Sequence, residues 1–345
     1  MAIRFSRRAF LRLLGASSLG VAIGAGVRVT ANIYGSVPLR TRLGWLARSL
    51  EMRLLASPAL VALGECPYYD NSVLDCLRQV WQQAAMPDVR DRKVLVKPNL
   101  IDAIESNPVT TAPQVVGALV DLLIELGARE VIVGDGPGNR REAWPVAQAC
   151  GLAPELLARG IPLVDLNYDD PRPVPAPPQW FGETRQLWLP RSARDADLIV
   201  SVPKLKTHHW AGISLSLKNL FGLLPGARYG WPKNFLHFNG IARSIMGLYE
   251  TARTLAPVVA VVDGITGMEG DGPLFGKAVA HGLLAAGRDP VAVDTVCAGL
   301  MGFTLEQAPY LEVAAWTGAG QAARVNTVGV SRERLRRQYE LPPGM

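Results

Sequence analysis

The chain has 345 residues, of which 49% are hydrophobic and 19% charged, a composition typical of a globular protein with a sizeable core. The net charge of +6 is concentrated at the start: residues 1–50 contain eight arginines and no acidic residue, whereas the remainder holds 28 basic and 30 acidic residues. A body so close to neutral excludes a basic groove for nucleic acid.

The first segment has the pattern of an export signal. Residues 6–12 read SRRAFLR, and an uncharged run over residues 13–27 follows them. Paired arginines before a short apolar run resemble a twin-arginine signal, so residues 1–31 are interpreted as that signal, with an ordinary membrane anchor as the alternative. The pattern predicts passage through the twin-arginine translocase to the periplasm, with a membrane tether if the segment is not cleaved.

Residues 32–58 are interpreted as a linker with an amphipathic segment. Between residues 39 and 55, arginines alternate with leucines and Trp45 at helical spacing. Such a helix could lie on an anionic membrane surface, so residues 1–55 are a candidate membrane contact. A plain surface helix remains the alternative.

The body alternates short β-branched runs with amphipathic stretches. Strands are expected at residues 60–63, 93–96, 130–133, 162–166, 198–202, 258–262 and 281–286, and helices at 72–85, 112–126, 241–255 and 290–301. This alternation predicts one α/β domain over residues 59–330, with a mostly parallel sheet covered by helices on both faces. The proline-rich stretch 169–179 is expected to be an insertion without regular structure, and residues 331–345 a tail.

Four of these expected strands end on polar groups. Lys97 and Asn99 follow one, Asp135 a second, Lys204 and Lys206 a third, and Asp263 a fourth. Ligands of open parallel sheets bind in the crevice beyond the carboxyl ends of the strands, so we expect these groups to share one crevice.

The same segments resemble the domain of unknown function 362 family. The matching stretches are VLVKPNL, VGDGPG, VPKLKTHHWAGISLSLKNLFGLLPG, VVDGITGMEGDGP and AAGRDPVAVDTVCAGLMG, which lie between about residues 60 and 305. The resemblance implies that they form one site, but it names no reaction. Some members carry ferredoxin-type cysteine clusters. Here Cys66, Cys76, Cys150 and Cys297 form no CxxC pair, so no iron–sulfur cluster is expected; buried thiols are favoured, with one or two disulfides as the alternative.

Lysine usage identifies the candidate chemistry. Most of the basic residues are arginines, yet four of the seven lysines fall between residues 204 and 233. A crowded or buried lysine suits anion capture, proton transfer or imine formation. We assign Lys206, Lys218 and His208 as candidate catalytic groups. The candidate anion-binding groups are Lys97, Asn99, Lys204, Thr207 and Asn219.

The histidines and acids complete the expected site. Because His208 and His209 are consecutive, only one would face the crevice from an extended strand, and His208 is preferred as the neutral base. His237 and His281 are expected to be peripheral. Asp135, Asp263, Glu269 and Asp271 are candidates for tuning charge or for binding Mg²⁺ or Ca²⁺. Asp294 could reach the site or pair with Arg288.

Two functional hypotheses follow. The first is an exported enzyme that binds a small anionic substrate or cofactor and performs a redox, isomerisation or metal-assisted hydrolytic step. The second is a binding module with the same pocket and no turnover.

Overall fold

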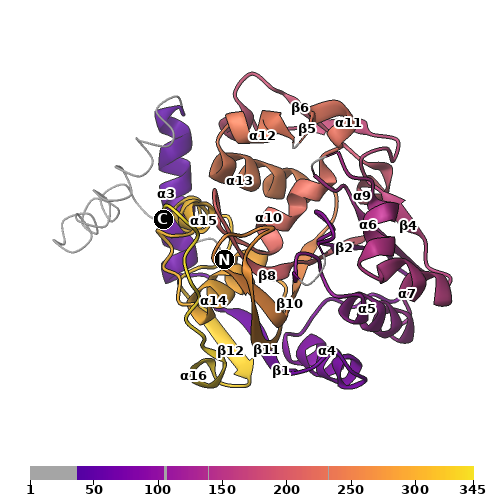
Figure 1. The fold of residues 1–345 in the computed structure, drawn as a ribbon. Coiled ribbons are helices and arrows are strands. Elements are labelled where there is room, and N and C mark those ends of the chain that lie inside the picture. Colours follow the sequence, from indigo (N-terminus) through magenta and orange to yellow (C-terminus); the bar gives the residue numbers. More distant parts are fainter. Residues whose placement is uncertain (1–36, 105–106, 139, 232) are drawn as a thin grey trace.

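The computed structural model describes residues 37–104, 107–138, 140–231 and 233–345. Their main feature is a ten-stranded sheet in the order β12-β1-β11-β10-β7-β2-β3-β4, with β8 and β9 attached through β10 (Figure 1). The strands are β1 (Ala59–Glu65), β2 (Lys93–Pro98), β3 (Glu130–Asp135), β4 (Leu163–Asp165), β7 (Leu198–Val202), β8 (Lys204–His208), β9 (Gly212–Ser214), β10 (Val258–Glu269), β11 (Lys277–Gly287) and β12 (Val325–Gly329).

Most neighbouring strands are parallel. Antiparallel pairing in this sheet is limited to β11 with β1 and β10, and to β9 with β8. The strands are buried on both faces: along β2, Leu95 packs into one core, while Val94 and Val96 pack into the other. This is the arrangement expected of continuous apolar strands alternating with helices, so the predicted α/β fold is confirmed.

Helices cover each face. The helices of one core are α4 (Ser72–Gln83), α5 (Pro113–Glu125), α6 (Ala143–Ala149) and α7 (Leu152–Ala158). On the other side are α3 (Leu39–Leu54), α10 (Ser216–Asn219), α13 (Ile241–Ala252), α14 (Pro290–Leu300) and α15 (Pro309–Thr317). All seven expected strands and all four expected helices are present, whereas β8, β9 and β12 were not predicted, and β10 runs on to Glu269.

The expectation that residues 169–179 lack regular structure is wrong. Strand β5 (Arg172–Pro175) pairs antiparallel with β6 (Gln186–Leu189) in a separate two-stranded sheet. In this pairing Val174 lies opposite Leu187, and both side chains are buried. A two-stranded sheet leaves each strand an open edge, and proline's missing N–H is tolerated there. Helix α8 (Pro178–Phe181) follows directly.

Both ends of the described chain pack onto the body. In helix α3 the indole ring of Trp45 stacks on that of Trp180 at 4.9 Å. Leu335 of α16 (Arg332–Leu335) and Tyr339 are buried in the same core cluster as Trp45, so the expected tail contributes to the core. Leu39, Leu43 and Leu54 of α3 are exposed. The predicted signal over residues 1–31 lies outside the described residues.

All four cysteines are free thiols, and all but the half-buried Cys150 are buried. Burial raises the pKa of Cys150 and of Cys297. Within residues 37–345, apart from the few gaps, none of the helices combines the length and apolar character needed to cross a bilayer.

Candidate functional site

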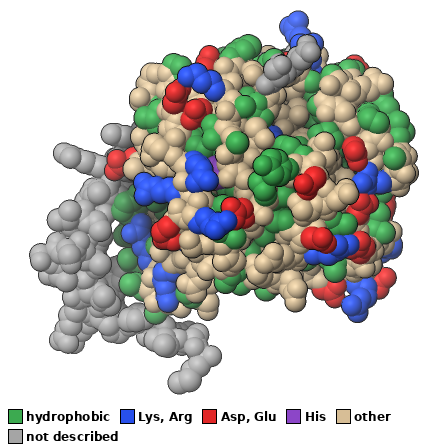
Figure 2. Space-filling view, turned by 60° about the horizontal axis from the view of Figure 1, so that its bottom comes forward, with side chains coloured by type: hydrophobic (Ala, Val, Ile, Leu, Met, Phe, Trp, Pro, Cys, Tyr) green, Lys and Arg blue, Asp and Glu red, His purple; other side chains and the backbone are tan. Residues whose placement is uncertain are grey.

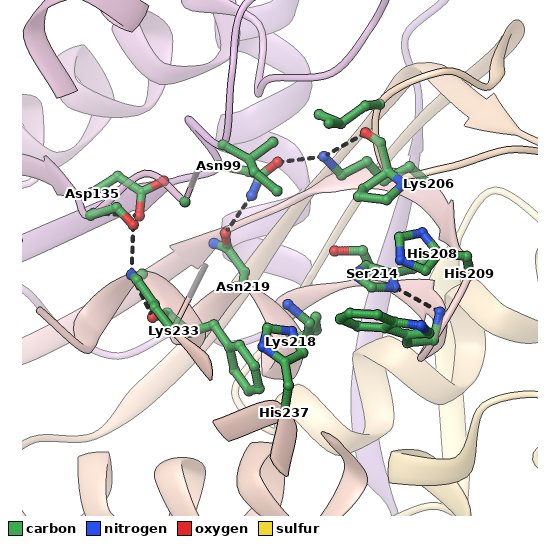
Figure 3. Close-up of a pocket in the computed structure, with 18 of the residues that line it drawn as sticks. Asn99, Asp135, Lys206, His208, His209, Ser214, Lys218, Asn219, Lys233 and His237 are labelled. Atoms are coloured by element: carbon green, nitrogen blue, oxygen red, sulfur yellow. Dashed lines mark hydrogen bonds between the residues drawn. The ribbon is translucent and has the colours of Figure 1, made fainter. Parts of the chain in front are cut away.

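A cavity of about 270 Å³ opens where β2, β3 and β8 end against α10 and the segment 221–237. Seven of the expected site residues line it: Lys97, Asn99, Asp135, Lys206, His208, Lys218 and Asn219, of which all but Lys97 are labelled in Figure 3. Four further polar residues that were not assigned to the site also line it: His209, Ser214, Lys233 and His237.

The cavity does not include five residues that the sequence placed in the crevice: Lys204, Thr207, Asp263, Glu269 and Asp271. Lys204 instead donates to Asp263 at 2.7 Å and to the Tyr69 hydroxyl at 2.8 Å. Asp263 also accepts from Tyr69 and from the backbone N–H of Ala112, at the start of α5. These contacts join the loop after β1 to β8, β10 and α5, so this ion pair is a structural contact beside the cavity.

The acidic residues do not assemble into a metal centre. Glu269 accepts from the backbone N–H of Glu340 at 2.9 Å, and Asp271 is exposed. Among the described residues there is no group of three His, Cys, Asp or Glu side chains arranged to hold a metal ion. Thr207 donates to the carbonyl of Gly270 at 2.9 Å, and this bond fixes β8 to the end of β10.

The ammonium of Lys97 is fully occupied by protein acceptors. It forms an ion pair with Asp135 at 2.6 Å and donates to Pro98 O at 2.8 Å and Asn219 Oδ1 at 3.1 Å. Burial lowers the pKa of Lys97, and the charge of Asp135 opposes this effect. Asp135 also accepts from the backbone N–H of Leu100 at 2.6 Å. Lys97 and Asp135 therefore offset each other in the cavity wall.

Two glycines permit this close packing. A Cβ atom on Gly222 would collide with Asp135 Oδ1 and lie 2.6 Å from Lys97 Nζ, while one on Gly136 would lie 2.6 Å from the carbonyl oxygen of Gly222. Only a residue without a side chain lets these two loops meet over the buried ion pair.

Lys206 is also engaged by the protein. Its ammonium donates to Asn99 Oδ1 and Val109 O, both at 2.7 Å, and to Pro273 O at 3.5 Å. Burial, followed by the charges of Lys218 and Lys204, holds the pKa of Lys206 well below its usual range. Because its donors are directed at three protein oxygens, Lys206 ties β8 to two loops and has little donor capacity left for a ligand.

Lys218 differs from the other lysines of the cavity. Its side chain is 9% exposed, and within the described chain its Nζ has no hydrogen-bond acceptor. It lies 3.9 Å from the centre of the Phe221 ring, and no dashed line reaches it in Figure 3. Burial, together with the positive charge of Lys97, lowers its pKa to about 7. A substantial fraction of this amine is therefore neutral at physiological pH.

Lys233 is a cavity lysine that sequence reasoning did not assign to the site. Its ammonium donates to Gly136 O at 2.7 Å and to Phe221 O at 3.0 Å, which leaves one N–H without a described acceptor. Burial lowers its pKa to about 7. It lies between helices in a segment with no strand-end pattern, so the one available signal was the local clustering of lysines.

His208 is held in one tautomer. Its Nδ1 accepts the backbone N–H groups of Trp210 at 3.1 Å and Ala211 at 3.3 Å. Burial, followed by the charge of Lys218, keeps its pKa well below the usual range, so the ring is neutral and its proton sits on Nε2. The neutral ring was expected, but its basic nitrogen is turned to the backbone. At the cavity His208 is thus a hydrogen-bond donor.

The expected positions of His209 and His237 are wrong. His209 also lines the cavity, because β8 ends at His208 and the alternation of a strand stops there; the two rings stack at 4.8 Å. His237 is not peripheral: it lines the cavity and meets the Trp210 ring edge-on at 4.8 Å. His281 is remote from the cavity and pairs with Tyr339 at 3.0 Å.

The short helix that carries Lys218 is anchored from beneath by Asp294. This fully buried carboxylate accepts the backbone N–H groups of Ser216 at 2.9 Å and Leu217 at 3.0 Å, and also the Ser216 hydroxyl. Burial raises the pKa of Asp294 to about 7. Asp294 does not line the cavity and forms no ion pair with Arg288; it supports the site from outside by fixing the first turn of α10.

Comparisons with known proteins place the chain in a family. The model of the domain of unknown function DUF362 matches residues 94–299, which is more than half of the chain, so the protein belongs to this family. The match covers the strand ends and α10, and therefore every lining residue described above. The family description assigns no activity.

The chain is also similar to individual proteins and solved structures. The thylakoid-associated protein sll1697 of Synechocystis is 34% identical over 215 residues, which cover 61% of this chain and 63% of that protein. The chain thus spans just under two thirds of the length of this relative. Among solved structures, the lactate racemase apoprotein of Thermoanaerobacterium thermosaccharolyticum aligns with 73% of this chain and 58% of its own, at 15% identity and a TM-score of 0.43. A Thermotoga maritima protein aligns with a TM-score of 0.38 at 13% identity.

Proposed function

We propose that this protein is an enzyme that binds a small anionic substrate in the cavity and uses Lys218 as its reactive amine. The observation that carries the proposal is the contrast among the cavity lysines. The donors of Lys97 and Lys206 are directed at protein oxygens, whereas Lys218 is buried beside the cavity without a described acceptor. Retaining an unpaired lysine in the interior costs stability, and such groups cluster at functional sites.

The charge around the cavity favours an anion. Asp135 offsets Lys97, and Lys206, Lys218 and Lys233 add positive charge when protonated. In a low-dielectric cavity this charge attracts an anion more strongly than it would at the surface. The Nε2–H of His208 supplies a fixed neutral donor beside it. A carboxylate or phosphate group therefore suits the site better than a neutral ligand.

Calorimetric titration tests this proposal. We expect glyoxylate or inorganic phosphate to bind the wild-type protein, and Lys218→Met to weaken that binding at least about tenfold. Lys218→Arg, which keeps a cation, should retain most of the affinity. Lys277→Met serves as the matched control, because Lys277 is an exposed lysine that does not line the cavity. Equal affinities in all four proteins would refute the anion site.

We further propose that the protein is exported by the twin-arginine route. The support is the sequence SRRAFLR followed by the uncharged run over residues 13–27. The exposed leucines of α3 and its four arginines fit contact with an anionic membrane surface after export. Cell fractionation tests both points: a protein that stays in the cytoplasm when the pair Arg7–Arg8 is intact would disprove the export proposal.

A further inference from the structure

We propose that Lys218 acts as a covalent nucleophile and forms an imine with the carbonyl carbon of a small anionic aldehyde or ketone. This inference rests on the proposed function, because it assumes that the cavity binds an anion, and it adds the substrate class and the bond that forms. It stands on three features of the cavity: an amine without an acceptor, a fixed hydrogen-bond donor and a surplus of positive charge.

The first feature is the environment of the amine. A lysine nucleophile must be neutral, and desolvation with a neighbouring cation is the usual means of making it so. Lys218 has both: it is buried against the Phe221 ring, and Lys97 lies close enough for its charge to lower the pKa of Lys218 to about 7. Its Nζ has no acceptor among the described residues, in contrast to Lys97 and Lys206, whose ammonium groups donate to protein oxygens.

The second feature is the donor that can polarise a carbonyl. His208 Nδ1 is engaged by two backbone N–H groups, so the proton is fixed on Nε2 and this ring can only donate toward the cavity. A neutral imidazole donor of this kind stabilises the negative charge that develops on a carbonyl oxygen under attack. His208 and Lys218 both line the cavity, from β8 and α10, and Figure 3 shows their side chains among the lining residues.

The third feature is the charge that selects the substrate. Lys233 keeps one N–H without a described acceptor, and Lys206, which also lines the cavity, adds positive charge when it is protonated. A carbonyl compound that carries its own carboxylate would be drawn into this positive cavity, whereas a neutral aldehyde would not. The volume of about 270 Å³ accommodates such a small molecule.

The step balances without a further reactant. The lone pair of Lys218 Nζ attacks the carbonyl carbon and gives a carbinolamine. The C–O bond of the carbinolamine then breaks, the two amine protons leave with the oxygen as water, and a C=N bond remains. The imine nitrogen is more easily protonated than the parent carbonyl oxygen, so the adduct withdraws electrons from the adjacent carbon and prepares it for loss of a proton or a carboxyl group.

Reductive trapping tests the inference. The protein is incubated at pH 7 with glyoxylate and sodium cyanoborohydride, which converts an imine into a stable secondary amine, and the modified lysines are found by peptide mass spectrometry. We expect Lys218 to gain one carboxymethyl group at least ten times faster than exposed Lys277. Acetaldehyde, which has the same reactive group without the carboxylate, should show a smaller preference for Lys218.

The variants separate this inference from the proposed function. Lys218→Arg should bind glyoxylate in calorimetry yet give no adduct in the cavity. If the wild type binds glyoxylate but Lys218 is not modified faster than Lys277, the covalent role is wrong and the anion site stands. If neither glyoxylate nor phosphate binds the wild-type protein, both ideas fail.

Discussion

Lys218→Met should make the protein more stable than the wild type at pH 6, by on the order of 3 kcal/mol. The reason is that the wild-type amine has a pKa of about 7 when folded, against an ordinary value of 10.5. Below pH 7 the folded protein carries the whole cost of a buried ammonium. Methionine has a similar length and buries no charge. Denaturant unfolding of both proteins at pH 6 measures the difference.

The stability advantage of Lys218→Met over the wild type should shrink as the pH rises. Between pH 7 and 10.5 the unfolded chain binds more protons at this lysine than the folded protein does, so wild-type stability increases with pH in this window. At pH 9 the gap between the variant and the wild type should be roughly halved. Lys277→Met, in an exposed ion pair with Glu340, should change little at either pH. A Lys218→Met protein that is less stable than the wild type at pH 6 would contradict the unpaired state of this amine.

Asp263→Ala should destabilise the protein by about 3–5 kcal/mol, because it leaves the ammonium of Lys204 buried without its carboxylate. Asp263 is fully buried, and it also accepts from Tyr69 and from the backbone at the start of α5. Thermal or denaturant unfolding at pH 7 measures the loss.

The double variant with Lys204→Met sharpens this test. If the penalty comes from an uncompensated charge, removing Lys204 as well should restore part of the stability lost in Asp263→Ala. The cavity lies beside this ion pair and does not include it, so the double variant, once folded, should still bind glyoxylate. A double variant no more stable than Asp263→Ala would show that the carboxylate acts mainly through its backbone contacts.

The fold was predictable because its strands are buried on both faces. Apolar runs such as Val94–Val96 and Leu198–Val202 leave little ambiguity about a parallel sheet between two helical layers. The strand-end pattern also brought Lys97, Asp135 and Lys206 together correctly. It depends only on chain direction, which the α/β alternation establishes.

Which lysines line the cavity and which form ion pairs outside it could not be predicted from their spacing in the sequence. Lys204 and Lys206 are two residues apart on β8 and so leave the same face of the strand. They meet different partners because Tyr69 arrives from the loop after β1, whereas Asn99 arrives from the end of β2. Which loop reaches which lysine is decided by packing across the sheet, and the sequence carries no local sign of it.

The tautomer of His208 and the position of His237 could not be predicted from the sequence for similar reasons. The first depends on a tight turn at Trp210 and Ala211 that presents two N–H groups to one ring nitrogen. The second depends on tertiary packing before α13, which brings His237 to the cavity lining. Neither feature has a periodicity that can be read along the chain.

The ionisation of Lys218 in solution tests the central claim most directly. With ¹³C-labelled lysine, the chain gives signals from seven side chains, and Lys218→Met assigns the one of interest. We predict that the Cε signal of Lys218 titrates with a pKa of about 7, and that saturating phosphate raises this pKa because a bound anion favours the ammonium form. A titration near 10.5 that phosphate does not move would contradict both the buried free amine and the anion site built around it.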